Sequence, residues 1–567
     1  MKKMKKILVM CICLAMVLSS LSACKKSESK DNNTSDATAA SDSTEGAKEL
    51  KSIDYSEPVE YSYWLYATPG DYNSDYNNNP VVNYLNKKFN MTLSFQQPAS
   101  GTDTDSLNIM LGTGEYTDII DSNYYTGSIN QLFADGVIID IAQYLDYMPN
   151  LKALLEADDK LRKNTYNDEG QLLKLPIVST DNENAWGGLV YRRDILKTMT
   201  GDNIAFPSGN ESPITIADWD YMLPLYKQYF EAAGMKDYAP LILPAKGYFD
   251  SGDLLTGFGT APSYYLDNGT IKYGPMQDGF YNYLVKMKEW YKNGYIYKDF
   301  ASRTNDLFYM PNTALTYGGA AGVWYGLGSQ LGDTLSMPDY GLTVDVQAAA
   351  NPIDQEHGVT TAPNLVYTGK NERTGGAMIT SSCKNIERLL ATMDYLYSEE
   401  GSYLKEYGLT KEQGAAENEL YVNNGLADGT YTKNTDGTLT FNSKSILNGG
   451  SLPLAEFADV RMPGLGYNKY TIEAARNIEK AASPTWLSYG NTGKLPSILR
   501  TTDEESTYSH NQSKIDDYVN TMVLKFILGD EELSETSWSK FKTQLEADGV
   551  SDNIAVQQAA FDRYQAR

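Results

Sequence analysis

Strand and helix patterns alternate along residues 59–121, and this order restricts the possible folds more than any other feature of the chain. Val59 to Tyr66 alternates like a strand, and Pro80 to Phe89 is predicted as a helix with proline in its first turn. Met91 to Phe95 is predicted as a strand, Ser106 to Leu111 as a helix and Thr117 to Asp121 as a short buried strand. This succession predicts a mainly parallel sheet with helices on both faces, which is an α/β fold.

Turn and capping residues place further elements along the chain. Thr215 followed three residues later by Asp218 is close to a capping box and predicts the start of a helix. The dipeptides Asn268-Gly269 and Asp436-Gly437 each predict a β-hairpin. Residues 526–558 are predicted to be helical, so the chain should end in helices.

The N-terminus has the order of a secretory signal. Four lysines among the first six residues lead into the apolar run Ile7 to Leu18, and small residues follow up to Cys24. The apolar run is shorter than the ~18–20 residues that a membrane-spanning helix needs. We therefore expect residues 1–23 to be a signal peptide of an exported protein.

The end of this signal, Leu21-Ser22-Ala23-Cys24, resembles a bacterial lipobox. The resemblance implies cleavage before Cys24 and attachment of lipid, with acyl chains such as palmitate, to its thiol. Diacylation supplies the two chains that stable anchoring requires. The expected location is the extracytoplasmic face of the cell membrane. The alternative is an ordinary signal peptide in which Cys24 is incidental.

Residues 24–54 are predicted to be a lipidated cysteine and a disordered tether. Lys25 to Lys51 consists mainly of Lys, Ser, Asp, Asn, Thr, Ala and Glu, which cannot bury enough apolar surface to offset their ordering entropy. A coil of this length has a root-mean-square span of about 30 Å. The tether would hold a globular body off the membrane and leave it free to swivel.

The charge of the chain excludes several kinds of partner. The formal net charge is −25, and removal of the four signal lysines takes it to −29. Nucleic-acid binding needs clustered Lys and Arg, so a chain this acidic is a poor candidate for it. The same acidity argues against a polybasic membrane patch, so the lipid should be the sole anchor.

Cysteine and histidine are too scarce for most metal or nucleophilic chemistry. Cys383 is the one cysteine left after Cys24, so neither an intramolecular disulfide nor a cysteine metal cluster is expected. His357 and His510 lie outside every zinc or catalytic-triad motif and are expected at the surface. We expect no metal, no cofactor and no catalytic residues.

Aromatic residues are unusually common, with 44 Tyr, 15 Phe and 7 Trp. Several lie beside Gly, Asn or Asp, where a ring can stack on a sugar while neighbouring amides and carboxylates bind its hydroxyls. For any single ring a core position is the alternative. These clusters are Tyr61–Tyr66, Asn123–Tyr125, Trp186–Gly188, Tyr317–Gly319, Trp324–Gly326 and Trp486–Tyr489.

Short segments that follow one another in a fixed order along nearly the whole body resemble those of bacterial extracellular solute-binding lipoproteins of ABC importers. The resemblance is to the family-1 type that includes maltodextrin- and alginate-oligosaccharide-binding proteins. It implies an α/β, two-lobed, periplasmic-binding-protein-like fold of type II with the ligand cleft between the lobes. The segments are Gly114–Ile120, Ala134–Ile141, Asp168–Gln171, Lys174–Pro176, Leu189–Leu196, Glu289–Gly294, Tyr395–Gly401 and Phe526–Gly529 before Trp538.

The resemblance also implies where the chain crosses between lobes. The first crossing is expected near Leu175 to Ala185, and the return near Leu342 to Gln347. The expected divisions are 55–178 as the first part of the N-lobe, 179–342 as the first part of the C-lobe, 343–405 as the N-lobe return, and 406–567 as helices and a hairpin mainly of the C-lobe with some hinge contribution.

In this family, loops at strand ends carry the ligand contacts, as in open α/β sheets generally. The chain departs from the calcium loop of some members, because the Asp71 to Val82 stretch has Tyr76 where an EF-hand has Gly and Val82 where it has Glu. The implied ligand-binding residues are Trp64, Tyr66, Asp121, Asn123, Tyr124, Tyr125, Trp186, Trp324 and Tyr325.

These features favour a lipid-anchored, monomeric receptor that closes on an oligosaccharide and delivers it to an ABC permease. A receptor for peptides or other small solutes is the alternative within the same fold, with Arg192, Arg193 or Arg373 meeting a carboxylate. An exported glycoside-acting enzyme would need two placed carboxylates, and the sequence singles out no such pair. We therefore expect a binding protein rather than an enzyme.

Overall fold

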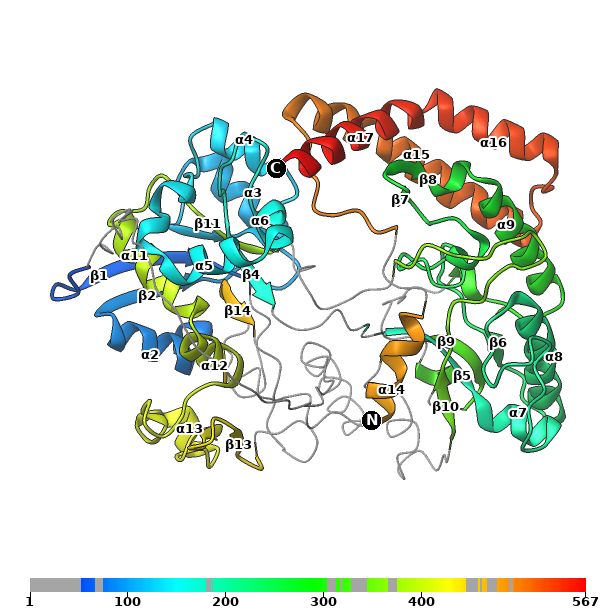
Figure 1. Ribbon diagram of the computed structural model, residues 1–567, viewed down its shortest axis with the longest axis horizontal. Coiled ribbons are helices and arrows are strands. Elements are labelled where there is room, and N and C mark those ends of the chain that lie inside the picture. The colour runs from blue at the N-terminus through cyan, green and yellow to red at the C-terminus, as the bar shows by residue number, and fades with distance from the viewer. Residues whose placement is uncertain are drawn as a thin grey trace, which may run out of the picture.

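The computed structural model describes residues 53–66, 75–179, 185, 187–302, 313–316, 319–327, 344–365, 375–444, 457–458, 461–466, 477–488 and 493–567. Two lobes lie side by side, each built around its own sheet, and the C-terminal helices run across the top of lobe 2 as far as the edge of lobe 1 (Figure 1). Cys24, Trp186 and the start of the loop after Asp71 lie outside the described residues.

Lobe 1 contains a six-stranded sheet in the order β14-β4-β11-β3-β1-β2. β1 is parallel to β2 and β3, and β4 is parallel to β14, whereas β11 is antiparallel to both β3 and β4. The predicted α/β sheet is therefore present with one reversed strand. The bounds are β1 (Val59–Trp64), β2 (Met91–Gln96), β3 (Ile119–Asp121), β4 (Leu175–Ser179), β11 (Gly376–Ile379) and β14 (Gly464–Gly466).

Both faces of this sheet are covered, because alternate residues of a strand point to opposite sides. In β1, Tyr61 and Tyr63 belong to one apolar cluster and Trp64 belongs to another. In β3, Ile119 and Ile120 divide in the same way. The helices of this lobe are α2 (Pro80–Lys88), α3 (Asp103–Thr113), α4 (Ile129–Ala134), α5 (Pro149–Ala157), α6 (Asp159–Thr165), α11 (Ile386–Asp394), α12 (Glu399–Tyr407) and α13 (Glu419–Asn423).

Lobe 2 contains a four-stranded sheet in the order β10-β5-β9-β6, in which β5 is antiparallel to both of its neighbours. The predicted capping box of Thr215 and Asp218 is present at the start of α8, and the predicted Asn-Gly hairpin is β7–β8. The strands are β5 (Gly187–Arg192), β6 (Ala239–Leu241), β7 (Tyr264–Asp267), β8 (Thr270–Tyr273), β9 (Ala321–Leu327) and β10 (Val346–Ala348).

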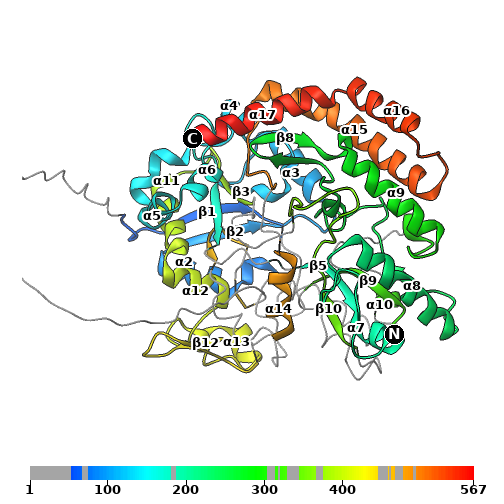
Figure 2. The ribbon, with the colours of Figure 1, turned by 45° about the vertical axis from the view of Figure 1, so that its right-hand side comes forward.

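The helices of lobe 2 form an outer layer that Figure 2 shows from the side. One apolar cluster joins α8, α9 and the C-terminal helices through buried residues such as Trp219, Trp290, Phe526 and Phe541. These helices are α7 (Arg193–Thr200), α8 (Ile216–Ala232), α9 (Asp278–Lys292), α10 (Thr313–Thr316), α14 (Asn477–Trp486), α15 (Thr502–Leu528), α16 (Glu535–Ala547) and α17 (Val550–Ala566).

The return to lobe 1 comes later than the sequence predicted. β10 pairs with β5, with Val346 opposite Arg192, so this part of the 343–405 segment belongs to lobe 2. Ile353 also bridges to Thr215 in lobe 2, whereas Gly376 is the first residue of a lobe-1 strand. A strand as short as Val346–Ala348 fits either sheet by its pattern, so its partner is decided only by tertiary pairing.

The division at residue 406 also differs from the prediction. Residues 406–466, as far as they are described, pack on lobe 1 rather than mainly on lobe 2, with Leu409, Tyr421, Phe457 and Leu465 in the lobe-1 core. The Tyr421 hydroxyl accepts a hydrogen bond from Leu409 N at 2.8 Å and donates one to Phe457 O at 2.6 Å. This part of lobe 1 includes the predicted second hairpin, β12 (Tyr431–Lys433) with β13 (Leu439–Phe441).

The C-terminus brings the chain back to lobe 1. The end of α17 lies beside α6 in both ribbon views (Figures 1 and 2). Lys163 Nζ of α6 donates to Gln565 O at 3.1 Å, and Thr502 Oγ1 at the start of α15 donates to Gln131 Oε1 of α4 at 3.3 Å. Helices that pack on lobe 2 therefore also contact lobe 1.

Candidate functional site

The carboxyl ends of β1 and β3 bring the first group of predicted residues together. Tyr63 pairs with Ile119 and Trp64 with Ile120 in parallel register, so Tyr66 and the residues after Asp121 emerge at the same edge of the sheet. The rings of Tyr66 and Tyr124 meet edge to face, with centroids 5.1 Å apart. Both side chains are partly exposed, so this pair can offer ring surface to a ligand.

Trp64 lies behind this pair rather than in front of it. Its side chain is 2% exposed and packs in an apolar cluster with Leu107 and Ile120. Its ring approaches that of Tyr124 at 6.2 Å. The structure therefore gives Trp64 a supporting position, in which it fixes the orientation of Tyr124.

Asp121 and Asn123 form a rigid polar turn beside the rings. Asp121 is 4% exposed and accepts hydrogen bonds from Asn123 N at 3.0 Å and Asn123 Nδ2 at 2.7 Å. Burial raises the pKa of Asp121, although these two bonds and the charge of Arg461 oppose that shift. Gly375 packs so closely on Asn123 that a Cβ there would overlap its amide. Asn123 itself remains exposed and can bind a hydroxyl group.

Arg461 is a member of this site that the sequence did not identify. Its Nη1 donates to Tyr66 O at 3.2 Å, and its charge acts on both Asp121 and Tyr124. Arg461 comes from the segment before β14, which the sequence assigned mainly to lobe 2. We call Tyr66, Asp121, Asn123, Tyr124 and Arg461 the lobe-1 wall.

Tyr125 follows the wall but turns away from it. Its ring lies against Gly127, where a Cβ would contact the phenol, and it borders the apolar cluster around Leu132. Burial raises its pKa, with Asp135 adding to the shift. Tyr125 therefore closes the loop onto α4 instead of extending the Tyr66–Tyr124 surface.

The predicted lobe-2 residues that the structure describes are buried in their own lobe. Trp324 and Tyr325 in β9 are each 2% exposed, and Tyr325 packs on Phe249 with ring centroids 5.6 Å apart. β9 ends opposite the start of β5, with Leu327 paired to Gly187. These two rings shape the edge of the lobe-2 sheet from inside and do not join the lobe-1 wall.

Trp486 packs over β5, a position that the sequence did not assign to it. Its indole lies so close to Gly188 that a Cβ there would overlap the ring, and its Nε1 donates to Leu189 O at 2.9 Å. Asn364 Nδ2 donates to Trp486 O at 2.8 Å. The aromatic cluster at Trp486–Tyr489 was a usable signal, but its pairing with Gly188 depends on a contact across about 300 residues.

The buried carboxyl group of Asp253 lies close to the backbone of Leu189 in β5. Asp253 accepts a hydrogen bond from Ser251 Oγ at 2.6 Å, and burial raises its pKa to about 7. The next residue, Leu254, has φ +68°, which is strained for a non-glycine residue, and Asn351 Oδ1 accepts its N–H at 2.8 Å. This edge is therefore built to a fixed shape.

The remaining reactive side chains lie elsewhere. Cys383 is buried, and burial raises the pKa of its thiol to about 12, so it is an inert packing residue. His357 contacts Asp354 at 2.7 Å, and His510 is exposed on α15. The described residues contain no group of three or more His, Cys, Asp and Glu side chains placed to hold a metal ion.

No protein-family model and no curated protein matches the sequence. Solved structures match it over most of their length. An HMO-binding solute-binding protein of an ABC transporter from Bifidobacterium longum infantis aligns with a TM-score of 0.71 at 18% identity, covering 90% of this chain and 99% of that one. The alginate-binding protein AlgQ2 gives 0.67 at 17%, covering 89% and 98%.

A third similar structure is the substrate-binding protein FusA of an ABC transporter from S. pneumoniae in complex with kestose. It aligns with a TM-score of 0.64 at 18% identity, covering 89% of this chain and 99% of that one. These likenesses show that the chain has the two-lobed fold of such binding proteins. Among the residues that the structure describes, no helix is both long and apolar enough to cross a membrane.

Proposed function

We propose that the protein is an extracytoplasmic receptor of an ABC importer that captures an oligosaccharide between its lobes. The observation that supports this most is the lobe-1 wall, where two partly exposed rings stand beside an amide, a buried carboxyl group and a guanidinium. The fold adds support, because the solved proteins that share it are named as binding alginate, HMO and kestose.

The wall suits a sugar for a chemical reason. A pyranose has apolar C–H faces and a rim of hydroxyl groups, so it needs flat ring surface next to fixed donors and acceptors. Tyr66 and Tyr124 supply the ring surface, and Asn123, held by Asp121, supplies both a donor and an acceptor. A peptide receptor would need a charged pair for the termini, and Asp121 is too buried to serve a free amine.

Capture would proceed by closure of the lobes. A ligand that contacts both lobes favours the closed arrangement by its difference in affinity for the two states. The closed monomer would then be the form that the permease recognises and from which it accepts the sugar. No catalytic step is part of this proposal.

The anchor is a separate part of the proposal. Cleavage before Cys24 and lipidation of its thiol would tie the protein to the extracytoplasmic face of the membrane, and residues 25–54 would act as the tether. This arrangement keeps the receptor close to its importer while the two lobes move freely.

Isothermal titration calorimetry against a panel of neutral and acidic oligosaccharides tests the proposal. We expect saturable binding of at least one oligosaccharide that is recovered unchanged afterwards. Binding of peptides from a library, together with no binding of any saccharide in the panel, would contradict the sugar assignment. Cleavage of the bound oligosaccharide, abolished by one carboxylate substitution, would contradict the assignment as a non-enzymatic receptor.

A further inference from the structure

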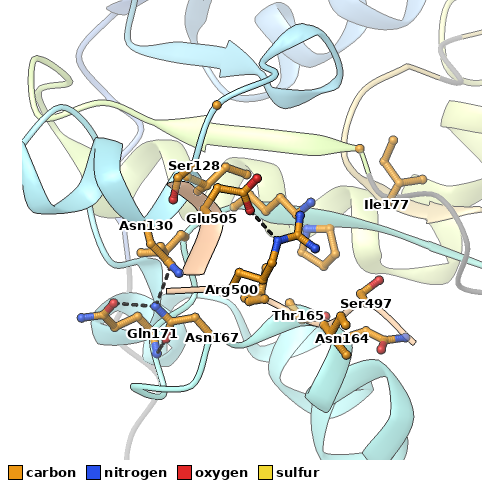
Figure 3. Close-up of a pocket in the computed structure, with 18 of the residues that line it drawn as sticks. Ser128, Asn130, Asn164, Thr165, Asn167, Gln171, Ile177, Ser497, Arg500 and Glu505 are labelled. Atoms are coloured by element: carbon orange, nitrogen blue, oxygen red, sulfur yellow. Dashed lines mark hydrogen bonds and ion pairs between the residues drawn. The ribbon is translucent and has the colours of Figure 1, made fainter. Parts of the chain in front are cut away.

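A cavity of about 320 Å³ lies at the junction of the two lobes (Figure 3). Lobe 1 lines it with the start of α4, with α6 and with Asn167, Gln171, Leu173, Lys174, Pro176 and Ile177. The chain leading into α15, residues 497–500, and Glu505 of that helix line the opposite side. Both lobes therefore supply the lining of one partly open cavity.

The polar side of this cavity consists of side-chain amides that hydrogen bond to one another. Asn167 is 3% exposed, and its Nδ2 donates to Asn130 Oδ1 at 3.1 Å and to Gln171 Oε1 at 2.7 Å. Its Oδ1 accepts from Gln171 N at 2.8 Å. Each partner amide thereby has its orientation fixed, and a fixed amide can bind a hydroxyl group without losing side-chain freedom.

The other side of the cavity is apolar and carries little free charge. It includes Leu161, Leu173, Ile177 and Ile498. Arg500 is neutralised by Glu505, whose Oε2 lies 2.7 Å from Arg500 Nε.

Two further contacts of Arg500 and the burial of Lys174 define the charge of this space. Arg500 Nη1 donates to Gln557 Oε1 at 3.0 Å, and the guanidinium carbon lies 3.9 Å from the centroid of the Tyr508 ring. Burial lowers the pKa of Lys174, the other cation of the lining, and so disfavours its charged form. A neutral ligand fits this lining better than an anion.

We infer that this cavity binds one neutral pyranose ring. Its volume lies at the small end of the ~300–1,000 Å³ range of ligand pockets, which suits a single ring rather than a chain. A lining that is amide-rich on one side and aliphatic on the other matches the hydroxyl rim and the C–H face of such a ring. The ligand class rests on the proposed function, since it extends carbohydrate recognition to a second place.

The ring has two possible sources. Gly375 lines the cavity and also packs against Asn123 of the lobe-1 wall, so the terminal ring of a captured oligosaccharide could enter the cavity from the wall. A free monosaccharide could occupy it alone. In either case the ring contacts both lobes and so stabilises the arrangement in which they meet.

Two variants test the inference by calorimetry on the purified protein. Ser497→Phe fills the cavity from the loop before α15, and Asn130→Leu removes the amide while keeping its size. Ser539→Phe on α16 and Asn83→Leu on α2 are matched controls, because both residues are exposed and neither lines the cavity. The probes are D-glucose, D-galactose, D-mannose, galacturonate and neutral oligosaccharides of two to six units.

We expect both cavity variants to weaken binding at least tenfold and both controls to leave it unchanged. If a free hexose binds the parent protein and no longer binds the cavity variants, the ring comes from a free monosaccharide. If the cavity variants lose only oligosaccharide binding, the ring in the cavity is the terminal ring of a captured oligosaccharide. If Ser497→Phe does not fold, the Asn130→Leu result alone decides whether the cavity binds a sugar ring.

Three outcomes would overturn the inference or its basis. Oligosaccharide binding that is unchanged in both cavity variants rejects the cavity site and leaves the proposed function standing. Binding of galacturonate in preference to the neutral sugars, lost in both variants, rejects the neutral class. Silence of the parent protein toward every saccharide rejects the proposed function together with this extension of it.

Discussion

Asp168 of lobe 1 accepts a hydrogen bond from Arg563 Nε of α17 at 2.6 Å, although the two residues are 395 positions apart. Arg567 Nε donates to the other oxygen of the same carboxylate at 2.7 Å, and Arg563 also pairs with both oxygens of Glu504 in α15. We call Asp168, Glu504, Arg563 and Arg567 the clasp. It joins helices packed on lobe 2 to the loop after α6.

Removal of the clasp carboxylate should loosen the contact between the lobes. Asp168 is 15% exposed and Arg563 is 31% exposed, so the bonds are partly shielded from water. Hydrogen bonds to charged groups contribute about 1.5–3 kcal/mol, and we expect Asp168→Asn to lower the free energy of unfolding by about 2 kcal/mol. Urea unfolding measures this change, and small-angle scattering should show a larger radius of gyration.

Asp428→Asn is the matched control for that variant. Asp428 pairs with Lys411 at 2.7 Å, and both side chains are exposed and belong to lobe 1. Exposed pairs of this kind contribute little. Equal effects of the two substitutions on unfolding and on the radius of gyration would show that the clasp does not hold the lobes together.

The buried carboxyl group of Asp253 should give stability an inverse dependence on pH. Burial raises its pKa from 3.8 to about 7, so the folded state holds a proton that the unfolded state has released between these values. Stability is then fully present below pH 3.8 and is lost as the pH rises to about 7, by about 4 kcal/mol at most.

Urea midpoints measured from pH 5 to pH 8 test this for the parent protein and for Asp253→Asn. The amide cannot ionise, so the variant should lose the part of the slope that Asp253 contributes. Identical slopes for the two proteins would mean that Asp253 is ionised in the folded state.

The ring of Tyr124 should contribute directly to affinity. Stacked aromatic contacts contribute about 0.5–1.5 kcal/mol beyond the area that they bury, so Tyr124→Ala should weaken oligosaccharide binding by up to about tenfold. Tyr124→Phe keeps the ring and its contact with Tyr66, and we expect it to bind much as the parent does. Calorimetry on both variants gives the comparison, and equal losses would assign the effect to the hydroxyl group instead.

Gly188 should tolerate no side chain. A Cβ at this position would overlap the indole of Trp486, whose Nε1 is bonded to Leu189 O. Overpacking of this kind costs about 1–3 kcal/mol, so Gly188→Ala should lower the melting temperature and shift the tryptophan fluorescence. Gly112→Ala in α3 is the control, since nothing lies within 4 Å of its added Cβ. An unchanged emission spectrum in Gly188→Ala would refute the packing of Trp486 on β5.

Cys24 should matter for location and not for binding. We expect Cys24→Ala to leave the membrane fraction while its calorimetric titration with oligosaccharide matches that of the parent protein. Cell fractionation followed by titration of the released protein separates the two properties. Loss of binding in this variant would mean that the anchor and the site are not independent.

Local patterns in the sequence were sufficient for most elements of the fold. The alternation in Val59 to Tyr66, the proline at the start of α2 and the Thr215–Asp218 capping box all act within a few residues, and the structure confirms each. The lobe that receives β10 or residues 406–466 is decided by pairing over long distances in the chain. Their short apolar patterns are compatible with either lobe.

The candidate site shows the same division. Tyr66, Asp121, Asn123 and Tyr124 come together because parallel strands end at one edge, which a sequence can indicate. Trp324 is buried, although it stands close to glycine residues in the sequence. An aromatic residue in such surroundings suits a core position as well as a binding position, so its neighbours could not show which of the two it takes. Arg461 and the clasp arginines had no local signal, since each acquires its role from a carboxylate or carbonyl group hundreds of residues away.

Small-angle X-ray scattering with and without saturating oligosaccharide tests the central claim most directly. If the protein captures a sugar by closing its lobes, at least one neutral oligosaccharide should reduce its radius of gyration, and a peptide mixture should leave the scattering unchanged. Scattering that stays the same across the whole saccharide panel would contradict capture by lobe closure.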